Sequence, residues 1–529
     1  MNTIRAILDQ PESAPITAPQ RQAAAGELAA ALQCQVYEAS LSRSQARLLA
    51  CAAEGRFRRL LVVAAAADPA LQAGRLPEAR SVEVSAGDRR FTVVSAPRSP
   101  EASAWLRTAL PWTAPRLIGL QTSVGLGDRL GLATPGHLAA VAGTGIAPIV
   151  AQQSIREMTR TQRSPGQVMD DACWGVFQAG WRDGFGSDAD HLKTTEDIDR
   201  TLAAGFTMFT IDPGDHVNAD ADAMPSSSLP LATEVVVWDG LEISADDFIR
   251  AYAGRQIPLA GGPSLTLDEE AVCRAAVKYG AAIAHTLRMY RHLSAACGGR
   301  PFELEVSVDE TETPTSAAEH YIIAAELGRL GVRWVSLAPR FVGAFEKGVD
   351  YKGDLEAFGR SFAVHAAIAR TLGPYKISLH SGSDKFSIYP VCAGHAGGLV
   401  HLKTAGTSYL EALRVIARRA PELFRGILDF ALSRFEEDRR SYHISASPAA
   451  MPRVHDLPDD ALESVLDGQD GRQILHVTFG SVLAARGPEG RPLFRDRLME
   501  CLLDHEAEHH EALARHLGRH VRPFARPAP

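Results

Sequence analysis

Residues 376–390 of the chain read KISLHSGSDKFSIYP, and this stretch contains the first indication of the fold. It begins as a buried strand does, with Ile377 and Leu379 alternating with Ser378. It then continues into His380 and a short polar loop that contains glycine. Burying polar groups without partners is unfavourable, so a core strand that ends in this way predicts a functional site or a bound metal at its carboxyl end.

Similar short strands recur along most of the chain. Eight candidates lie at 117–121, 146–152, 184–192, 206–212, 302–308, 333–339, 376–381 and 399–404. Most of the intervals between them have helical character, and the helix expected at 194–205 starts with a capping box from Thr194 to Asp197. Eight strands that alternate with helices predict an α/β protein of the (β/α)8 TIM-barrel class.

Changes in composition divide the chain into three predicted regions. Residues 1–112 form a small N-terminal α/β domain, with helices at 21–33 and 42–54 and strands at 58–66, 80–85 and 89–96. Residues 113–420 form the barrel, with an insertion at about 214–300, because that interval is too long for one crossover. Residues 421–529 form a mainly helical C-terminal extension. Its one run of strand character, QILHVTF at 473–479, could instead complete the barrel.

Composition narrows the class of protein. The chain has 529 residues, 46% of them hydrophobic, and a net charge of −8, whereas a nucleic-acid-binding surface needs a basic footprint. Its seven scattered cysteines form no CxxC pair, which fits reduced thiols in a cytoplasm. The sequence has no signal-peptide pattern and no run near the ~20 apolar residues of a membrane helix. We therefore expect a cytoplasmic protein with no nucleic-acid or membrane partner, and a homo-oligomer stays open.

Polar side chains follow most of the predicted strands, where active groups of such barrels gather. They are Asp188, Asp190, His191, Asp212, Glu303, Glu305, Asp309, Glu310, Arg340, Glu346, His380, His401 and Lys403. A single histidine at a strand end is more often a hydrogen-bonded core residue. Several at the same end of successive strands favour a site, and imidazole with carboxylate is a ligand set for Zn, Mn, Ni, Co or Fe(II).

Two other motifs match known patterns only in part. HEAEH at 505–509 fits the H-E-x-x-H pattern, but no acidic residue follows Glu511, so a solvated helix face is favoured. GLGDRLG at 125–131 lacks the glycine spacing of a dinucleotide fingerprint, and NAD binding is not predicted.

Several long motifs point to a known family. They are GLGDRLGLATPGH (125–137), APIVAQQSIREMTRTQRSP (147–165), GSDADHLKT (186–194), FTIDPGDH (209–216), SLAPRFVGAFEKGVDY (336–351) and LHSGSDKFSIYP (379–390). Together they resemble the tagaturonate epimerase family over about residues 115–420. This resemblance implies an isomerase that interconverts D-tagaturonate and D-fructuronate, with a small keto sugar acid as its partner.

The barrel is also similar, more faintly, to class II metal-dependent aldolases. Asp190-His191 matches the Asp-His pair after their third strand, and LHSGS matches their seventh strand end. This analogy implies one divalent cation (Mn, Ni, Co, Zn or Fe(II)) held by His191 and His380. No histidine follows the sixth strand, so Glu346 is the expected third ligand, with His401 as the alternative.

The implied reaction accounts for the remaining candidates. The two sugars differ at C4, whose hydrogen is not acidic because C4 is β to the ketone, so retro-aldol cleavage of C3–C4 and re-addition is the expected route. Asp190 is the expected base, with Asp309 or Glu310 as a second proton-transfer group. The candidate substrate-binding residues are Ser381, Gly382, Asp384, Lys385, Lys403 and Arg340. A class II-type aldolase, a non-catalytic sugar-acid-binding barrel and an enediol isomerase are the alternatives.

Overall fold

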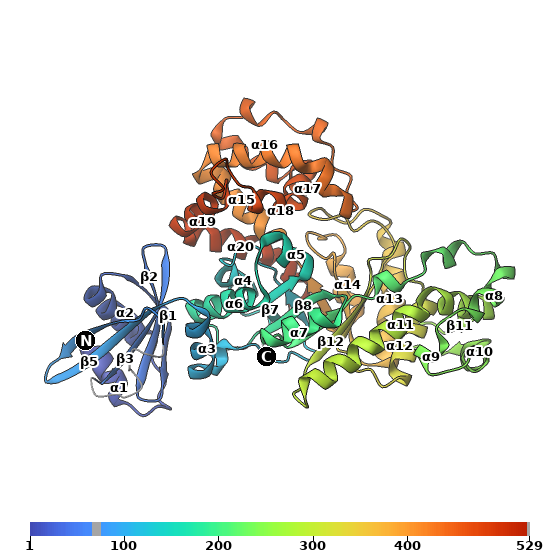
Figure 1. Cartoon of the computed structure of the whole chain (residues 1–529), viewed down its shortest axis with the longest axis horizontal. Helices are drawn as coiled ribbons and strands as arrows, with labels where there is room; N and C mark the ends of the chain where they lie inside the picture. The colour runs from blue at the N-terminus through green and yellow to red at the C-terminus, as the bar shows by residue number, and fades with distance from the viewer. Residues whose placement is uncertain (66–75, 526–529) are drawn as a thin grey trace.

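The centre of the protein is a closed barrel of eight parallel strands (Figure 1). This computed structural model describes residues 1–65 and 76–525. The barrel strands are β6 (Ser123–Gly125), β7 (Ala147–Ser154), β8 (Gly186–Leu192), β9 (Met208–Ile211), β12 (Glu303–Val308), β13 (Ser336–Pro339), β14 (Lys376–Leu379) and β15 (Val400–Lys403). β15 pairs with β6 to close the barrel, which confirms the predicted fold class.

Helices follow the barrel strands and cover the outside of the barrel. They are α4 (Thr134–Val141), α5 (Ile155–Thr161), α6 (Pro165–Ala179), α7 (Thr195–Ala203), α11 (Glu269–Cys297), α12 (Ala317–Arg329), α13 (Leu355–Leu372) and α14 (Tyr389–Ala396). The helix after the last strand, α15 (Thr407–Arg419), packs instead with the C-terminal helices. The capping box of α7 forms as predicted, with Thr194 accepting from the Asp197 N–H. Between β9 and α11 the chain adds α8 (Leu229–Glu234), α9 (Trp238–Leu241), α10 (Ala245–Tyr252) and the hairpin of β10 (Arg255–Ile257) and β11 (Leu265–Leu267).

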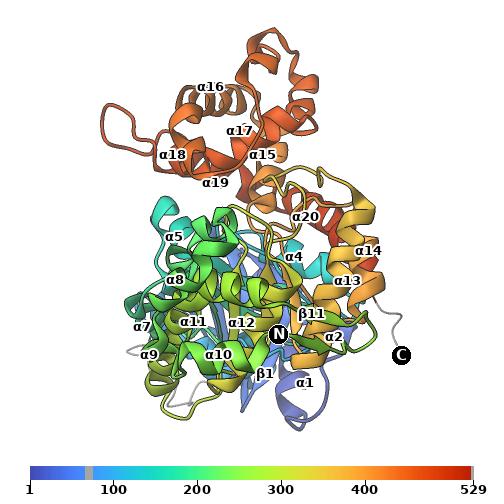
Figure 2. The ribbon, with the colours of Figure 1, turned by 90° about the vertical axis from the view of Figure 1, so that its right-hand side faces the viewer.

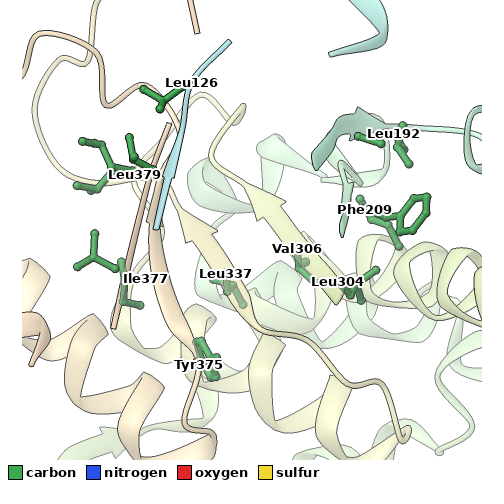
Figure 3. Close-up of a cluster of buried hydrophobic side chains, with 14 of the residues drawn as sticks. Leu126, Leu192, Phe209, Leu304, Val306, Leu337, Tyr375, Ile377 and Leu379 are labelled. Carbon is green, nitrogen blue, oxygen red and sulfur yellow. The ribbon is translucent and has the colours of Figure 1, made fainter. Parts of the chain in front are cut away.

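The barrel strands alternate between an apolar outer face and a polar inner face. Ile377 and Leu379 of β14 pack with Leu337 and Val306 in the apolar cluster between strands and helices (Figure 3). The alternate positions Lys376 and Ser378 are polar and face the interior, where Lys376 Nζ donates to Ser123 Oγ at 2.9 Å. Because side chains alternate along a strand, residues two apart share the inner face. This alternation brings the polar strand ends to one place.

The first predicted strand was placed wrongly. Residues 117–121 are a loop that ends in a turn, and the strand is β6 at Ser123–Gly125. Leu117 and Leu120 are partly exposed, and the N–H of Ile118 donates to Glu303 Oε1 at 2.7 Å. The apolar run therefore lies across the amino end of the barrel, where a side chain satisfies its backbone.

An antiparallel sheet precedes the barrel. It contains β1 (Gln35–Ser44), β2 (Arg47–Glu54), β3 (Phe57–Ala65), β4 (Arg80–Ala86) and β5 (Arg89–Pro97) in the order β1-β2-β3-β5-β4. One face packs on α1 (Asn2–Asp9) and α2 (Ala18–Leu32), and the other on α3 (Pro100–Ala109) and α6. The helix predicted at 42–54 is wrong, because this segment is the end of β1 and then β2. Both faces of β2 are covered, so Leu48–Ala53 lacks the polar alternation that indicates a strand.

The last part of the chain is helical and lies over one end of the barrel (Figure 2). It includes α16 (Pro421–Asp438), α17 (Gln469–Val477), α18 (Phe479–Ala484), α19 (Arg495–Asp504) and α20 (Glu506–Val521). QILHVTF was predicted as a strand and is instead α17 and the start of α18, with Gln473 and His476 buried beside Ile474 and Leu475. The run is only seven residues long and contains the β-branched and aromatic residues Ile474, Val477 and Phe479, and a short buried run of this kind cannot be told from a strand by its period alone. Within the described ranges, no helix is long and apolar enough to cross a membrane.

Candidate active site

Two adjacent residues at the end of β8 begin the candidate site. Asp190 and His191 would normally point to opposite faces of a strand. A register irregularity between Ala189 and Leu192 interrupts the pairing of β8 with β9, and His191 adopts φ +52°. Such irregularities redirect side chains beside active sites. Both Asp190 and His191 consequently reach the same group of potential ligands.

That group also contains His380, from the end of β14. One ligand atom from each of Asp190, His191 and His380 lies within 4.8 Å of the others. The rings of His191 and His380 meet edge to face with centroids 5.1 Å apart. Two imidazoles and a carboxylate fit the donor preferences of Zn, Mn, Ni, Co and Fe(II), so these residues can hold one divalent cation.

Carboxylates orient both histidines. His191 Nδ1 lies 3.1 Å from Asp212 Oδ2, and His380 Nδ1 lies 3.1 Å from Asp309 Oδ1. His380 Nε2 contacts Glu305. Burial opposes a charged imidazole, yet the surrounding carboxylates raise the pKa of His191 to about 10 and that of His380 to about 9. The same negative environment favours a divalent cation, and carboxylates behind ligating histidines are typical of metal sites.

A buried ammonium lies beneath this group. Lys403 Nζ is 2.6 Å from Asp190 Oδ1, 2.6 Å from Glu305 Oε1 and 2.9 Å from Asp188 Oδ2. Burial opposes its charge, but the three carboxylates hold the pKa of Lys403 well above its usual range. Burial also raises the pKa of Asp188 to about 6, against the opposite effect of Lys403. Lys403 was predicted to bind substrate, whereas the structure places its ammonium in this ion cluster.

Asp190 is held on both oxygens. Lys403 donates to Oδ1, and Gln152 Nε2, from the end of β7, donates to Oδ2 at 2.9 Å. Burial disfavours the charged form, but Lys403, His191 and His380 hold the pKa of the Asp190 carboxyl below its ordinary value. Asp190 is therefore ionised and fixed in direction. Gln152 was missing from the predicted site, although it ends a strand like the residues that were included.

The structure does not place Glu346 with the predicted metal ligands. Its Oε2 accepts from Lys352 Nζ at 2.9 Å, Gln473 Nε2 at 2.7 Å and Ser445 Oγ at 2.7 Å. In the part of the chain that the structure describes, Glu346 belongs to none of the potential ligand groups. Glu346 follows the sixth barrel strand, and its carboxylate instead connects the barrel to Ser445 and Gln473 in the C-terminal part of the chain.

His401, the alternative third ligand, belongs to a different group. It lies with Asp188 and Glu305 inside the barrel, and its Nδ1 is 3.0 Å from Ser123 Oγ. Burial lowers the pKa of His401 to about 3. The third residue that lies with His191 and His380 is therefore Asp190. Glu346 and His401 lie outside this group.

The loop after β14 serves two purposes. Ser381 lines a cavity and accepts from Lys347 Nζ at 2.9 Å. Gly382 allows a close approach, because an added Cβ would lie 2.4 Å from Leu402 Cδ1. Asp384 is buried between Arg472 Nη2 at 2.9 Å and His516 Nε2 at 2.6 Å. Lys385 donates to the carbonyls of Glu346, Val349 and Ser383 at 2.7, 2.6 and 2.9 Å.

Asp384 and Lys385 thus connect parts of the protein, and neither lines the cavity. Burial lowers the pKa of Lys385 to about 7. Of the six predicted substrate-binding residues, the cavity wall includes Ser381 and Arg340. Arg340 also donates to the carbonyl of Thr311.

This cavity has a volume of about 860 Å³ and opens at the carboxyl end of the barrel. The predicted catalytic residues Asp309 and Glu310 line it, together with His380. Its wall also includes Arg156, Lys347 and, from the C-terminal part of the chain, Arg439 and Tyr442–Ile444. Arg156 and Lys347 were absent from the predicted set, because their proximity depends on how distant loops fold together.

A closed parallel barrel with ionisable groups and a cavity at its carboxyl end has the architecture of a (β/α)8-barrel enzyme. The sequence model of the family described as tagaturonate epimerase (UxaE) matches residues 37–524. The chain therefore belongs to the tagaturonate epimerase family, which is a family of isomerases. This finding confirms the resemblance seen in the sequence motifs.

Individual relatives agree with this assignment. The chain is 46% identical over 424 residues to the tagaturonate/fructuronate epimerase of Thermotoga maritima, covering 80% of this chain and 85% of that protein. It is 35% identical, with a TM-score of 0.86, to a glycerol complex of the fructuronate-tagaturonate epimerase UxaE from Cohnella laeviribosi, covering 96% of this chain and 99% of that one. The native crystal structure of that enzyme matches with the same TM-score, covering 95% and 99%.

Proposed function

We propose that the protein is a metal-dependent epimerase that interconverts D-tagaturonate and D-fructuronate at C4. The observation that carries the proposal is that Asp190, His191 and His380 meet at the carboxyl end of the barrel and that His380 lines the cavity. The names of its relatives support this choice of substrate. In this proposal His191 and His380 hold the cation. When bound, it supplies Lewis-acid stabilisation of negative charge on the keto-sugar oxygens.

The side chains suit retro-aldol cleavage and re-addition. Asp190 accepts the proton of the C4 hydroxyl as C3–C4 breaks and returns it after the aldehyde has turned. Lys403 and Gln152 keep Asp190 ionised and aimed, which is the state that a base requires. If the turned aldehyde presents its oxygen on the opposite face, Asp309, in contact with His380 and lining the cavity, relays the same proton back to the C4 oxygen.

The cavity walls favour an epimerase over a lyase with the same chemistry. Arg439, Tyr442, His443 and Ile444 reach the cavity from the C-terminal part of the chain, so it is lined from more than the barrel loops. Glu346 fastens Ser445, next to this segment, by accepting from its N–H at 3.2 Å and its Oγ at 2.7 Å. A site walled in this way can retain the aldehyde half while it turns, whereas an aldolase releases it.

A carbon-13 NMR time course tests the proposed function. We expect C4-labelled D-fructuronate to approach a mixture with D-tagaturonate, without free fragments, after loading with Mn, Ni, Co or Zn and not in the metal-free protein. Accumulation of dihydroxyacetone and tartronate semialdehyde would instead identify a lyase on this site. Equal conversion with and without metal would refute the metal requirement.

Asp190→Asn tests the proposed base. The amide keeps the size of the side chain but cannot accept a proton, so turnover should fall about 10²- to 10⁴-fold. Metal content, measured by elemental analysis, should stay at the wild-type level, because the imidazoles of His191 and His380 remain. Loss of the metal would reassign Asp190 to ligation, and wild-type turnover would exclude it from both roles.

A further inference from the structure

We infer that Lys347 and Arg156 form the subsite that binds the carboxylate of the sugar acid. Both residues line the cavity beside the potential metal ligands. The inference rests on the proposed function and deepens it, because it assigns the group that distinguishes a sugar acid from a neutral sugar. Neither residue was among the substrate-binding residues predicted from the sequence, although Lys347 follows the sixth strand with Glu346.

Lys347 is a partly buried cation without an anionic partner. Its Nζ donates to Ser381 Oγ at 2.9 Å, which is a neutral acceptor. Among residues 1–65 and 76–525, no carboxylate oxygen lies within 4.0 Å of this ammonium, whereas Lys193, Lys278, Lys352 and Lys403 each have one. Burial lowers the pKa of Lys347, against the opposite effect of Glu310. A buried charge needs a partner, and here the accessible partner is an anion in the cavity.

Arg156 provides a second, incompletely paired cation on the same wall. It belongs to α5, and its nearest carboxylate is that of Glu310 at 3.5 Å. Its guanidinium lies over the ring of Tyr442, 5.3 Å from the centroid. Its Nε is buried and has no hydrogen-bond partner in the described part of the chain. A guanidinium with a free N–H is suited to a carboxylate, since its fork matches the two oxygens.

The other cations considered for this role are already engaged. Lys403 binds three carboxylates and Lys385 binds three carbonyls. Arg340 donates to Thr311. Arg439 lies over Phe435 and 3.6 Å from Glu436, a pairing as loose as that of Arg156. In the described part of the chain, however, Arg156 has a buried N–H without a hydrogen-bond partner and Arg439 has no such N–H. An incoming anion would have to displace the existing partners of these other cations. It can therefore bind more readily to Lys347 and Arg156.

The position of Lys347 fits the proposed reaction. Its partner Ser381 directly follows His380, so the carboxylate subsite is tied to the loop that carries one of the potential metal ligands. In retro-aldol cleavage the carboxylate belongs to the C4–C6 half, whose aldehyde must turn over before re-addition. An anchor at the carboxylate holds this half by its far end and leaves the aldehyde free to rotate.

Lys347→Met tests the subsite. We expect the KM for D-fructuronate to rise about 10- to 100-fold, because a charge-assisted hydrogen bond is lost. A purely structural defect would also weaken neutral ligands, so the deciding measurement compares a hexonate with the matching hexitol as competitive inhibitors. The inhibition constant of the hexonate should rise by the same factor, while that of the hexitol stays within about 3-fold.

Other variants provide the comparison. Lys347→Arg keeps the charge and should retain most of the preference for the hexonate. Arg156→Gln should reduce that preference less than Lys347→Met does, because Glu310 already shares its charge. Arg360→Met removes the same charge from the exposed face of α13, where Arg360 is 70% exposed, and should behave as wild type. Unchanged hexonate inhibition in Lys347→Met, or equal weakening of hexonate and hexitol, would overturn the inference.

The two proposals fail in different ways. A wild-type protein that does not convert D-fructuronate with any metal refutes the proposed function. Calorimetric titration of wild-type and Lys347→Met proteins with the hexonate still decides the subsite in that case, because it does not depend on turnover. A hexonate that binds both proteins equally would refute the subsite alone.

Discussion

His380→Ala is expected to lose the metal and to lower kcat/KM for epimerisation by about 10³-fold or more. His380 supplies one of the two imidazoles in the ligand group, and Asp309 and Glu305 orient it. Lewis-acid stabilisation contributes several kcal/mol, and each ~1.4 kcal/mol corresponds to a tenfold change in rate. The measurement is elemental analysis after dialysis, together with the rate at saturating added metal.

Glu346→Gln is the matched control for this variant. The Glu346 carboxylate is bound by Lys352, Ser445 and Gln473, and within the described residues it belongs to no group of potential ligands. We therefore expect Glu346→Gln to keep a wild-type metal content. Full occupancy in His380→Ala would remove His380 from the ligand set. Loss of the metal in Glu346→Gln would restore the ligand role predicted from the sequence.

Lys403→Met is expected to destabilise the barrel by about 3–5 kcal/mol, because it leaves a cluster of buried carboxylates without its counterion. Asp188, Asp190 and Glu305 all lie within 3.0 Å of the Lys403 ammonium, whose side chain is 2% exposed. Methionine fills a similar volume but supplies no charge. The measurement is the thermal midpoint by calorimetry, which should fall clearly below that of wild type.

Lys352→Met removes a lysine from a more exposed ion pair. Its side chain is 39% exposed and its ammonium lies 2.9 Å from Glu346. Exposed ion pairs contribute about 0–1 kcal/mol, so the thermal midpoint should change little. If Lys403→Met were no less stable than Lys352→Met, the central ion cluster would not support the barrel. Circular dichroism at low temperature separates loss of stability from failure to fold.

Much of the barrel could be predicted from local patterns. Short apolar runs separated by capped helices located seven of the eight strands, and the same pattern gave the class. The errors share a physical cause. Residues 48–53 of β2 and 471–477 of α17 are buried throughout, and short buried runs of this length do not reveal from their period alone whether they form a strand or a helix. The run at 117–121 is apolar but lies across the amino end of the barrel, where Glu303 satisfies its backbone.

The candidate site was predicted in part. Asp190, His191 and His380 follow their strands directly, and parallel strands deliver their carboxyl ends to one place, so their proximity could be expected. The third member of the ligand group could not be predicted, because Glu346 and His401 also follow barrel strands and were equally plausible ligands. Only the folded chain shows that Glu346 accepts from Ser445 and Gln473, which lie about a hundred residues further along.

The lysines show most clearly what each level of structure determines. The sequence alone determined the alternation of strands and helices that makes the barrel. It also determined that Lys403, Lys385 and Lys347 lie near the ends of barrel strands. It could not distinguish them, because each is a cation near a strand end. Tertiary structure decided that Lys403 neutralises three carboxylates, that Lys385 binds three carbonyls, and that Lys347 faces a cavity with only a hydroxyl as partner. The physical reason is that an ion's role depends on its neighbours within a few ångströms, and these come from strands and loops far apart in the chain.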